Sequence, residues 1–313
     1  MPDTKNVMTT GRIDHPINMY YKEKFLRRVM PRMIHALWGM ENPMPKNAGT
    51  NIKWRRYTSP TAQTTPLTEA VDPKPILQGK TDLTATVRQY GAWVKESTWL
   101  DLTGPNSHAA QRTKWLSDQF MLTIDTLCRA VISATASNST CTRGDDVATD
   151  FNTPDIEKVT ETMLGKEAMY ITRNIGASDK VGTAPILPAF IGITHTLLRN
   201  DIIALNGFRY VNQYGQNVTP HPGEIGSVTD VRICLTTNAY VASTSYYLSI
   251  IAEEAYGNVK IANADELLIY IPPEMAGSNL KQWSSYGWKA TYACKILNDN
   301  WLHALIGTRG ARS

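Results

Sequence analysis

The longest uninterrupted helical pattern, at about residues 106–137, constrains the fold more than any other feature of this sequence. Gly104-Pro105 precede it, and neither proline nor glycine recurs before Gly144. Apolar residues repeat at three- and four-residue steps along one face of this segment, namely Leu116, Phe120, Ile124, Leu127 and Val131. At 1.5 Å per residue the helix would be roughly 45 Å long. Because such a rod exceeds the width of a small domain, other elements must lie along it.

Residues 46–97 carry two strand-like segments separated by a proline-rich stretch. The first alternates over residues 50–57, and the second begins to alternate at residue 83 but slips near Gly91, where we expect a β-bulge. Residues 59–81 between them are irregular. An isolated two-stranded ribbon of this kind is marginally stable in water. We therefore expect the ribbon to lie either on the chain's own body or on a neighbouring molecule, and the second case predicts self-assembly.

The remaining segments predict an α+β protein. We expect a basic helix at about 17–38, kinked or divided at Pro31, and a second helix that Thr153 caps. The chain should close with a hairpin that turns at Asn298-Asp299-Asn300. Further elements are expected in the second half of the sequence: strands at 189–194, 228–235 and 267–271, a helix at 197–205, and a strand or short helix at 245–255.

Charge is unevenly distributed along the chain. Residues 1–60 contain eleven Lys and Arg against four Asp and Glu, and residues 281–313 contain five against one. Because the whole chain carries a net charge of +4, the middle is acidic. Two basic ends around an acidic body favour partners of opposite charge, in nucleic acid or in another subunit, although a solvated basic tail would have the same composition. A basic amphipathic helix also suits a membrane surface.

Sequence patterns typical of active sites do not occur. The chain contains no GxxxxGK[ST] or GxGxxG phosphate loop, no HExxH metal motif and no GxSxG nucleophile motif. His195 lies in an apolar segment, which is typical of a core residue. The sequence therefore predicts a protein that is not an enzyme and that has no cofactor or metal.

The cysteines and the apolar segments indicate where such a chain is made. None of the cysteines has CxxC spacing, which favours synthesis in a reducing, intracellular compartment. The most apolar segment, at 186–198, is too short to span a bilayer, and we expect no membrane partner. The four cysteines are Cys128, Cys141, Cys234 and Cys294.

An ordered set of short motifs resembles the major capsid proteins of tailed bacteriophages, specifically the coliphage N-four-like branch. The match extends over about residues 17–308. The chain departs from the family pattern at Ala70, where relatives tend to have Gly, and at Thr196 and Asn200, where they tend to have Pro-Asp pairs. The motifs are KWRRY at 53–57, PLTEAV at 66–71, ATVRQYG at 85–91 followed by Trp93-Val94, PGEIG at 222–226 followed by Val231-Arg232, and GWKA at 287–290 followed by Ile296-Leu297-Asn298.

This resemblance implies the Hong Kong 97-type capsid fold. An N-terminal arm with the basic helix would span 1–45, and an extended β-hairpin loop 46–97. A peripheral domain would combine 98–170 with 284–313, and would contain the spine helix at about 106–137 and the terminal hairpin. An axial domain would span 171–283. The terminal hairpin would pair with the strand at 85–94.

The resemblance also implies a function: a structural subunit that assembles into hexamers and pentamers of an icosahedral shell around the phage genome. Its partners would be copies of itself, packaged double-stranded DNA bound without sequence specificity, and scaffold, portal and decoration proteins. The shell would assemble in the host bacterial cytoplasm and form the virion capsid. Residues of the extended loop expected to contact a neighbouring subunit are Ile52, Trp54, Arg56, Tyr57, Leu67, Glu69 and Val71. Residues of the basic helix expected to face the lumen or a neighbour are Lys24, Arg27, Arg28 and Arg32.

Three alternatives remain open at this stage. The same fold could form an encapsulin-like compartment around enzyme cargo, which would lack packaged nucleic acid. The chain could be a monomeric nucleic-acid-binding protein that uses its basic N-terminal region, and the segment 53–57 interleaves aromatic and basic residues as single-stranded nucleic acid would require. An enzyme built on the axial region is the weakest alternative, because no catalytic spacing supports it.

Overall fold

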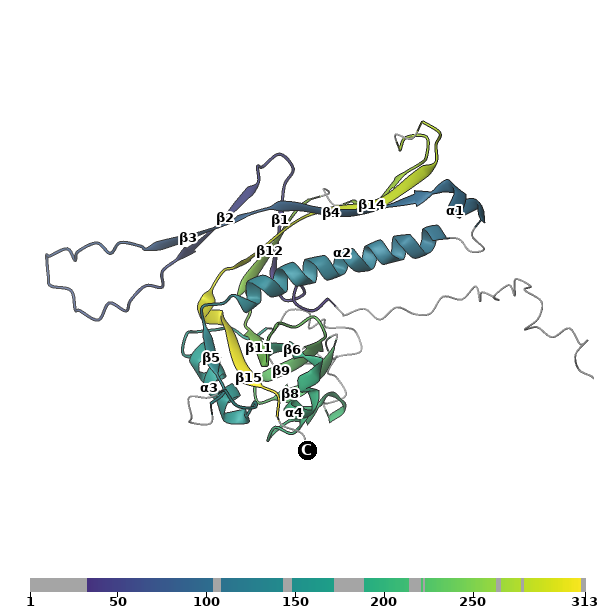
Figure 1. Cartoon of the computed structure of the whole chain (residues 1–313). Coiled ribbons are helices and arrows are strands. Elements are labelled where there is room, and N and C mark those ends of the chain that lie inside the picture. Colours follow the sequence, from purple (N-terminus) through teal and green to yellow (C-terminus); the bar gives the residue numbers. More distant parts are fainter. Residues whose placement is uncertain are drawn as a thin grey trace, which may run out of the picture.

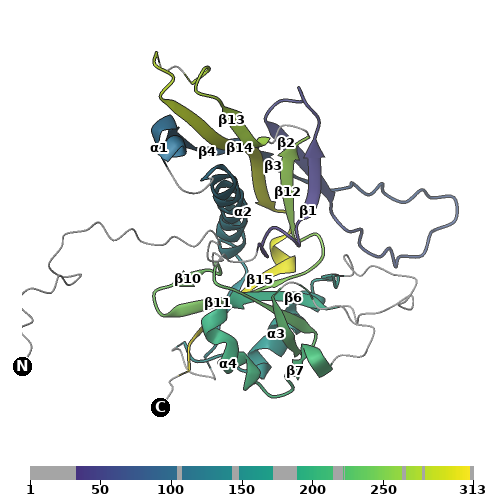
Figure 2. The same ribbon diagram turned by 90° about the vertical axis from the view of Figure 1, so that its right-hand side faces the viewer.

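Two β-sheets lie on either side of one long helix in the computed structural model of the chain (Figures 1 and 2). The structure describes residues 33–103, 108–142, 148–171, 189–213, 221, 223–262, 266–276 and 279–310. The long helix is α2, His108–Ser133, so it begins two residues later and ends four residues earlier than the sequence pattern predicts. The described part of the chain is an α+β structure, as expected.

Helix α2 presents one continuous apolar stripe to both sheets. The stripe runs at four-residue steps through Leu116, Phe120, Ile124, Cys128 and Ile132. Its C-terminal part therefore follows Cys128 and Ile132 rather than the expected Leu127 and Val131, which are only half-buried. A strict four-residue repeat drifts slowly around a helix with 3.6 residues per turn, so the stripe turns from the upper sheet toward the lower one.

The upper sheet has five strands and is organised around β14, Trp283–Ile296. One edge of β14 pairs antiparallel with β4, Arg88–Ser97. Its other edge pairs first with β13, Glu266–Ile271, and then with β12, Tyr256–Ile261. Strand β1, Met40–Met44, extends the sheet parallel to β12. Leu116 and Phe120 of α2 pack against Tyr286, Trp288 and Ala290 of β14, which fixes the helix along this sheet.

The lower sheet has eight strands in the described residues, in the order β5-β15-β11-β6-β9-β8-β7, with β10 paired to β11. Both faces of its central strands are buried. Helices α3, Thr153–Leu164, and α4, Arg199–Ile203, contribute Ile156 and Ile202 to the cluster on one face. The C-terminal half of α2 and the segment at 34–38 cover the opposite face. The strands are β5 Asn138–Thr140, β6 Phe190–His195, β7 Arg209–Tyr210, β8 Glu224–Val228, β9 Val231–Thr236, β10 Val241–Ala242, β11 Ser245–Ile251 and β15 Leu302–Thr308.

The expected terminal hairpin is wrong, because its two strands belong to different sheets. Strand β14 ends at Ile296 in the upper sheet, and a 3-10 turn at Asp299–Trp301 redirects the chain. Strand β15 then pairs with β11 and β5 in the lower sheet. Turn residues mark a reversal of the chain but carry no information about which partner the next strand finds.

Three further elements differ from the sequence expectations. The second strand of the ribbon breaks at Val87 and not near Gly91, so that β3, Lys80–Thr86, and β4 join different partners. Asn152, rather than Thr153, caps α3 by accepting a hydrogen bond from the Asp155 backbone N–H at 2.8 Å. The expected basic helix falls mostly outside the described residues, and its final segment, 33–38, forms turns.

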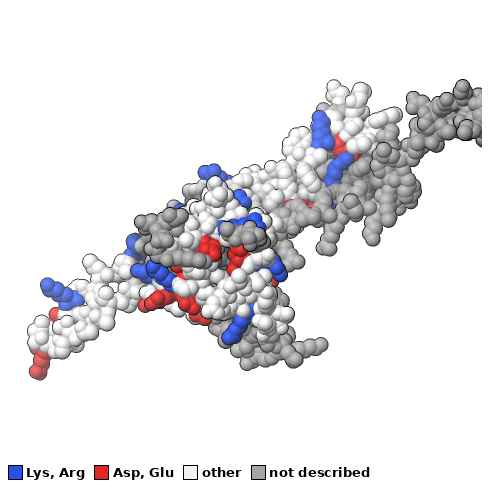
Figure 3. All heavy atoms as spheres, turned by 60° about the horizontal axis from the view of Figure 1, so that its bottom comes forward, with Lys and Arg blue, Asp and Glu red and all other residues white. Residues whose placement is uncertain are grey.

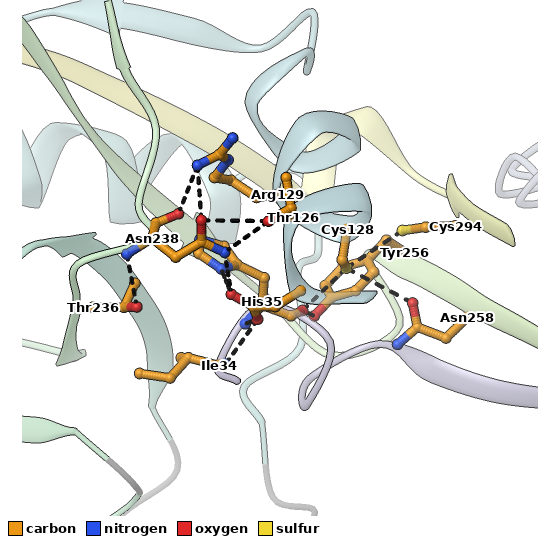
Figure 4. A network of polar contacts seen from close by, with 11 residues as sticks. Ile34, His35, Thr126, Cys128, Arg129, Thr236, Asn238, Tyr256, Asn258 and Cys294 are labelled. Carbon is orange, nitrogen blue, oxygen red and sulfur yellow. Dashed lines mark hydrogen bonds and ion pairs between the residues drawn. The ribbon is translucent and has the colours of Figure 1, made fainter. Parts of the chain in front are cut away.

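A buried polar network joins the segment at 34–36 to α2 and to both sheets (Figure 4). The Asp125 carboxylate accepts the backbone N–H groups of Ile34 and His35 on Oδ1, at 2.9 and 2.7 Å. Its Oδ2 lies 3.0 Å from His35 Nδ1 and accepts the Asn238 side-chain amide at 2.7 Å. The His35 carbonyl in turn accepts the Tyr256 hydroxyl. One carboxylate therefore fixes chain segments that are far apart in sequence.

The pKa of Asp125 reflects two opposing effects. Burial alone would raise it, but the hydrogen bonds from His35 and Asn238 lower it below the ordinary value of 3.8. A carboxylate whose folded pKa is lowered contributes stability above its unfolded pKa and loses that contribution as the pH falls through the folded value. The network is therefore strongest near neutral pH and fails in acid.

Replacing Asp125 by Asn should destabilise the protein by about 3 kcal/mol, because an amide presents donors where all the surrounding groups already donate. Denaturant unfolding of wild type and D125N at pH 7 measures this difference. The difference should shrink below about pH 4, as the wild-type carboxyl is protonated. Glu161→Gln, at an exposed position of α3, is the control and should change stability by less than about 0.5 kcal/mol. Equal stability of D125N and E161Q would contradict this role.

Candidate assembly interface

The hairpin formed by β2, Asn51–Tyr57, and β3 projects away from the body of the molecule (Figure 1). The two strands pair antiparallel over their whole length, from Asn51 opposite Thr86 to Tyr57 opposite Lys80. Beyond them, Thr58 donates its backbone N–H to the Gly79 carbonyl at 2.9 Å. The ribbon is therefore regular up to residues 58 and 79, and the irregular tip spans 59–78.

A cross-strand ion cluster locks the hairpin on its solvent face. The Asp82 carboxylate on β3 forms ion pairs with two residues of β2. Its oxygens lie 2.8 Å from Arg55 Nε and 2.8 Å from Lys53 Nζ. Hydrogen bonds from these two groups hold the pKa of Asp82 well below its usual range. Opposite charges across an antiparallel pair stabilise the register of the two strands.

The other face of the hairpin base packs on the chain's own core. Ile52 and Trp54 pack against a cluster that includes Ala85, Val87 and Val259. These two residues were expected to contact a neighbouring subunit, but here they anchor the hairpin to the upper sheet. The Trp54 indole N–H is buried and finds no hydrogen-bond acceptor among the described residues.

The tip of the hairpin exposes apolar side chains that the isolated chain does not cover. Leu67 and Leu77 are 76% and 94% exposed, and Val71 and Ile76 are also exposed. Ala70 adopts a φ of +61°, the left-handed region that favours glycine, and this is the position where the resembling family tends to have Gly. Ordering such a segment costs about 1–2 kcal/mol per residue in backbone entropy, and here little burial offsets that cost.

Strands β4, β14 and β13 lie at the end of the molecule opposite the hairpin tip (Figure 1), and this end carries a second apolar surface. A groove of about 580 Å³ crosses β4, β14 and β13, and its lining includes Trp93, Ile271 and Met275. Trp93 is 66% exposed and Met275 79% exposed. Gly287 lies opposite Trp93 in the sheet, and a side chain there would meet the Trp93 Cβ at 3.1 Å. Because large exposed apolar side chains line this groove, it is a candidate interaction site.

Short helix α1, Thr98–Thr103, extends this second surface. Trp99 and Leu102 of α1 are exposed, as is Leu280 in the connection between β13 and β14. Sequence reasoning missed these residues and also missed Ile76, Leu77 and Met275. The only sequence signal for these residues is their position. They are large apolar residues in predicted loops or near prolines, where they would not contribute to a core.

The remaining expected contact residues have mixed placements. Arg56, Tyr57 and Glu69 are exposed on the hairpin and its tip, so that all three are available to a neighbour. Lys and Arg side chains are mixed with Asp and Glu over the body of the molecule in the view of Figure 3. The four basic residues expected to face a lumen or a neighbour lie outside the described residues: Lys24, Arg27, Arg28 and Arg32.

Within the described ranges, no group of three or more His, Cys, Asp or Glu residues is arranged to hold a metal ion. Of the helices in the same ranges, none combines the length and the apolar character needed to cross a membrane. His195, expected in the core, is partly buried, and its Nδ1 accepts the Leu197 backbone N–H at 3.1 Å.

Solved structures that align with the chain include a phage capsid, a phage head and an encapsulin complex. The capsid of Ralstonia phage GP4 aligns with a TM-score of 0.70 at 10% identity, over 98% of this chain and 99% of that one. The head structure of Helicobacter pylori bacteriophage KHP40 aligns at 0.63 and 10% identity, over 99% and 100%. The holo-SrpI encapsulin complex from Synechococcus elongatus PCC 7942 aligns at 0.57 and 12% identity, over 95% and 94%.

The likeness to these proteins is one of structure and not of sequence. No protein-family profile matches the chain, and no curated protein matches it by sequence. The alignments extend over nearly the full length of both aligned chains, so they compare whole folds. The chain therefore has the Hong Kong 97-type capsid fold, which confirms the fold implied by its motifs.

Replacing Asp82 by Asn should loosen the hairpin without unfolding the body. We expect faster hydrogen exchange of the β2 and β3 amides and an unchanged melting temperature, because the ion cluster acts only within this exposed ribbon. Wild-type protein should show the same loosening as the pH falls below the ordinary carboxyl range, since the Asp82 pKa is lowered. Glu69→Gln in the tip is the matched control. Unchanged exchange in D82N would show that the cluster does not hold the ribbon.

Proposed function

We propose that this chain is the major capsid protein of a tailed bacteriophage, a structural subunit without catalytic activity. Copies of it assemble into hexamers and pentamers of an icosahedral shell that encloses double-stranded DNA. The observation that carries the proposal is the placement of two uncovered apolar surfaces at opposite ends of one elongated body. The capsid fold of the chain supports the interpretation of these surfaces as contacts between subunits.

The two ends support a head-to-tail contact between copies. The tip of the hairpin, 59–78, offers Leu67, Val71, Ile76 and Leu77, and the far groove offers Trp93 and Met275. Because the two surfaces differ, a contact between them is heterologous and repeats around a ring until the ring closes. Burial of apolar surface contributes about 25 cal/mol per Å², which offsets the entropy of ordering the tip.

The division of the chain into an N-terminal arm, an extended loop, a peripheral domain and an axial domain remains part of this proposal. The extended loop is the β2–β3 hairpin with its tip. The spine of the peripheral domain is α2, and the axial domain contains most of the lower sheet. The basic N-terminal residues Lys24, Arg27, Arg28 and Arg32 face DNA or a neighbouring copy, and the complete particle is the virion capsid, assembled in the bacterial cytoplasm.

An encapsulin-like compartment is the second candidate, and the alignment with the encapsulin complex favours it. Both candidates predict closed shells, so the contents must distinguish them. Particles purified from their native source should contain double-stranded DNA if the chain is a phage capsid protein. Particles that contain enzyme cargo and no DNA would favour the compartment.

Replacing residues 59–78 by Asn-Gly should abolish shell formation and leave the subunit folded. Thr58 and Gly79 already face each other across the ribbon, so a two-residue type I′ turn can join them. We expect a soluble species with native circular dichroism that sediments as a monomer or a small oligomer. Electron microscopy provides the assay, and normal shells from this variant would contradict the role of the tip.

Single charges in the tip should weaken assembly in proportion to the apolar surface lost. Leu77→Asp and Leu67→Asp should each reduce the binding free energy of one subunit contact by about 1.5–3 kcal/mol. This corresponds to roughly ten- to hundredfold weaker association. Light scattering against protein concentration measures the threshold for assembly. Gln63→Asp introduces the same charge at an exposed polar position of the tip and should shift this threshold far less. Equal shifts in all three variants would indicate a charge effect rather than docking.

A further inference from the structure

Two thiols are in contact where α2 meets β14 (Figure 4). The Sγ atoms of Cys128 and Cys294 lie 3.5 Å apart, and both cysteines are free. We infer that they form a dithiol site that a small-molecule disulfide oxidises to an intramolecular Cys128–Cys294 disulfide. This bond would join the long helix covalently to the central strand of the upper sheet.

The geometry allows the bond with a small displacement. The sulfurs must approach by about 1.5 Å to reach the usual disulfide length of about 2.05 Å. Cys294 is only half-buried and lines a cavity of about 350 Å³ between α2 and the upper sheet, whereas Cys128 is fully buried. A small oxidant can therefore reach Cys294 first, with Cys128 directly behind it.

The surroundings of Cys128 tolerate the loss of its thiol hydrogen. The thiol donates to the His35 carbonyl at 3.2 Å, but this oxygen also accepts the Tyr256 hydroxyl. The other neighbouring acceptor, Asn258 Oδ1, accepts the Tyr292 hydroxyl at 2.8 Å. Oxidation therefore leaves neither acceptor without a donor, and the usual cost of an unpaired buried polar group does not arise.

The reaction proceeds by two thiol–disulfide exchanges. The Cys294 thiolate attacks a disulfide RSSR, forms a mixed disulfide and releases RS⁻. The Cys128 thiolate then attacks the Cys294 sulfur, forms the internal bond and releases a second RS⁻. The two released RS⁻ ions take up the two protons lost by the cysteines. Two protein thiols are therefore oxidised while one RSSR is reduced to two RSH. Burial raises the pKa of Cys128, which makes the second exchange the slower one.

The bond would stabilise the subunit after it leaves a reducing environment. The two cysteines are 166 positions apart in the chain, so the bond would close a long loop and constrain the unfolded state strongly. Formation of the bond does not depend on the proposed function. Its usefulness to a particle outside the cell does rest on that function, since extracellular conditions are oxidising.

The test treats the purified full-length protein with oxidised glutathione at pH 8 and then alkylates it in denaturant. We expect two of the four cysteines to resist alkylation and mass spectrometry to find the peptides of Cys128 and Cys294 joined. The melting temperature should rise by roughly 5–10 °C and return to its starting value with a reductant. Four reactive thiols, a persistent glutathione adduct on Cys294, or a bond between other cysteines would each overturn the proposal.

Cysteine variants identify which thiols form the cross-link. The comparison of oxidised with reduced wild-type protein does not depend on whether these variants fold. Cys294→Ser and Cys128→Ala should each abolish both the cross-link and the oxidant-dependent rise in melting temperature. Cys141→Ala removes a buried thiol in a different cluster, whose pKa burial raises to about 12, and it should leave both effects intact. Shell assembly can be scored separately on the same samples, so a failure of this proposal is distinguishable from a failure of the proposed function.

Discussion

The Asp125 carboxylate holds the point at which the long helix and both sheets meet. It binds the backbone at Ile34 and His35 and the side chain of Asn238, and so connects the start of the described chain to the lower sheet. A buried carboxylate with several donors is stable only while all of them stay in place, because each lost donor exposes the full cost of desolvation. The network therefore specifies one arrangement of helix and sheets more strictly than apolar packing alone would do.

That rigid junction gives the two ends of the molecule a fixed separation. Helix α2 packs against β14 through Leu116 and Phe120 near its N-terminal end, and against the lower sheet through Ile132 near its C-terminal end. The hairpin base is anchored to the upper sheet by Ile52 and Trp54. Among the described residues, the tip and the far groove expose large apolar side chains, such as Leu77 and Met275, that the chain itself does not cover. The body is thus well determined, while in the proposed shell a second copy would cover its ends.

Local sequence signals predicted the elements better than their pairing. The apolar repeat on α2 and the alternation on β2 are periodic patterns that arise from each element's own geometry, and the structure contains both. The pairing of the last strand could not be read in this way. β15 follows a turn after β14, as a hairpin strand would, but its register is set by β11 and β5. The pairing of a strand with a distant one depends on which strand edge is still unpaired in the folded sheet. The turn residues before the strand carry no information about that edge.

The candidate interface shows the same division between local and global information. The proline-rich stretch at 59–81 indicated an irregular tip, and an unsupported ribbon indicated a need for a partner surface. The roles of Ile52 and Trp54 could not be read from their alternation, because a strand with one apolar face packs equally well on its own core or on a neighbour. Trp93 and Met275 reach one groove only because β4 and β13 meet across β14. A surface built from separate segments becomes visible only when the fold brings them together, and this is why the irregular tip was predictable and the candidate groove was not.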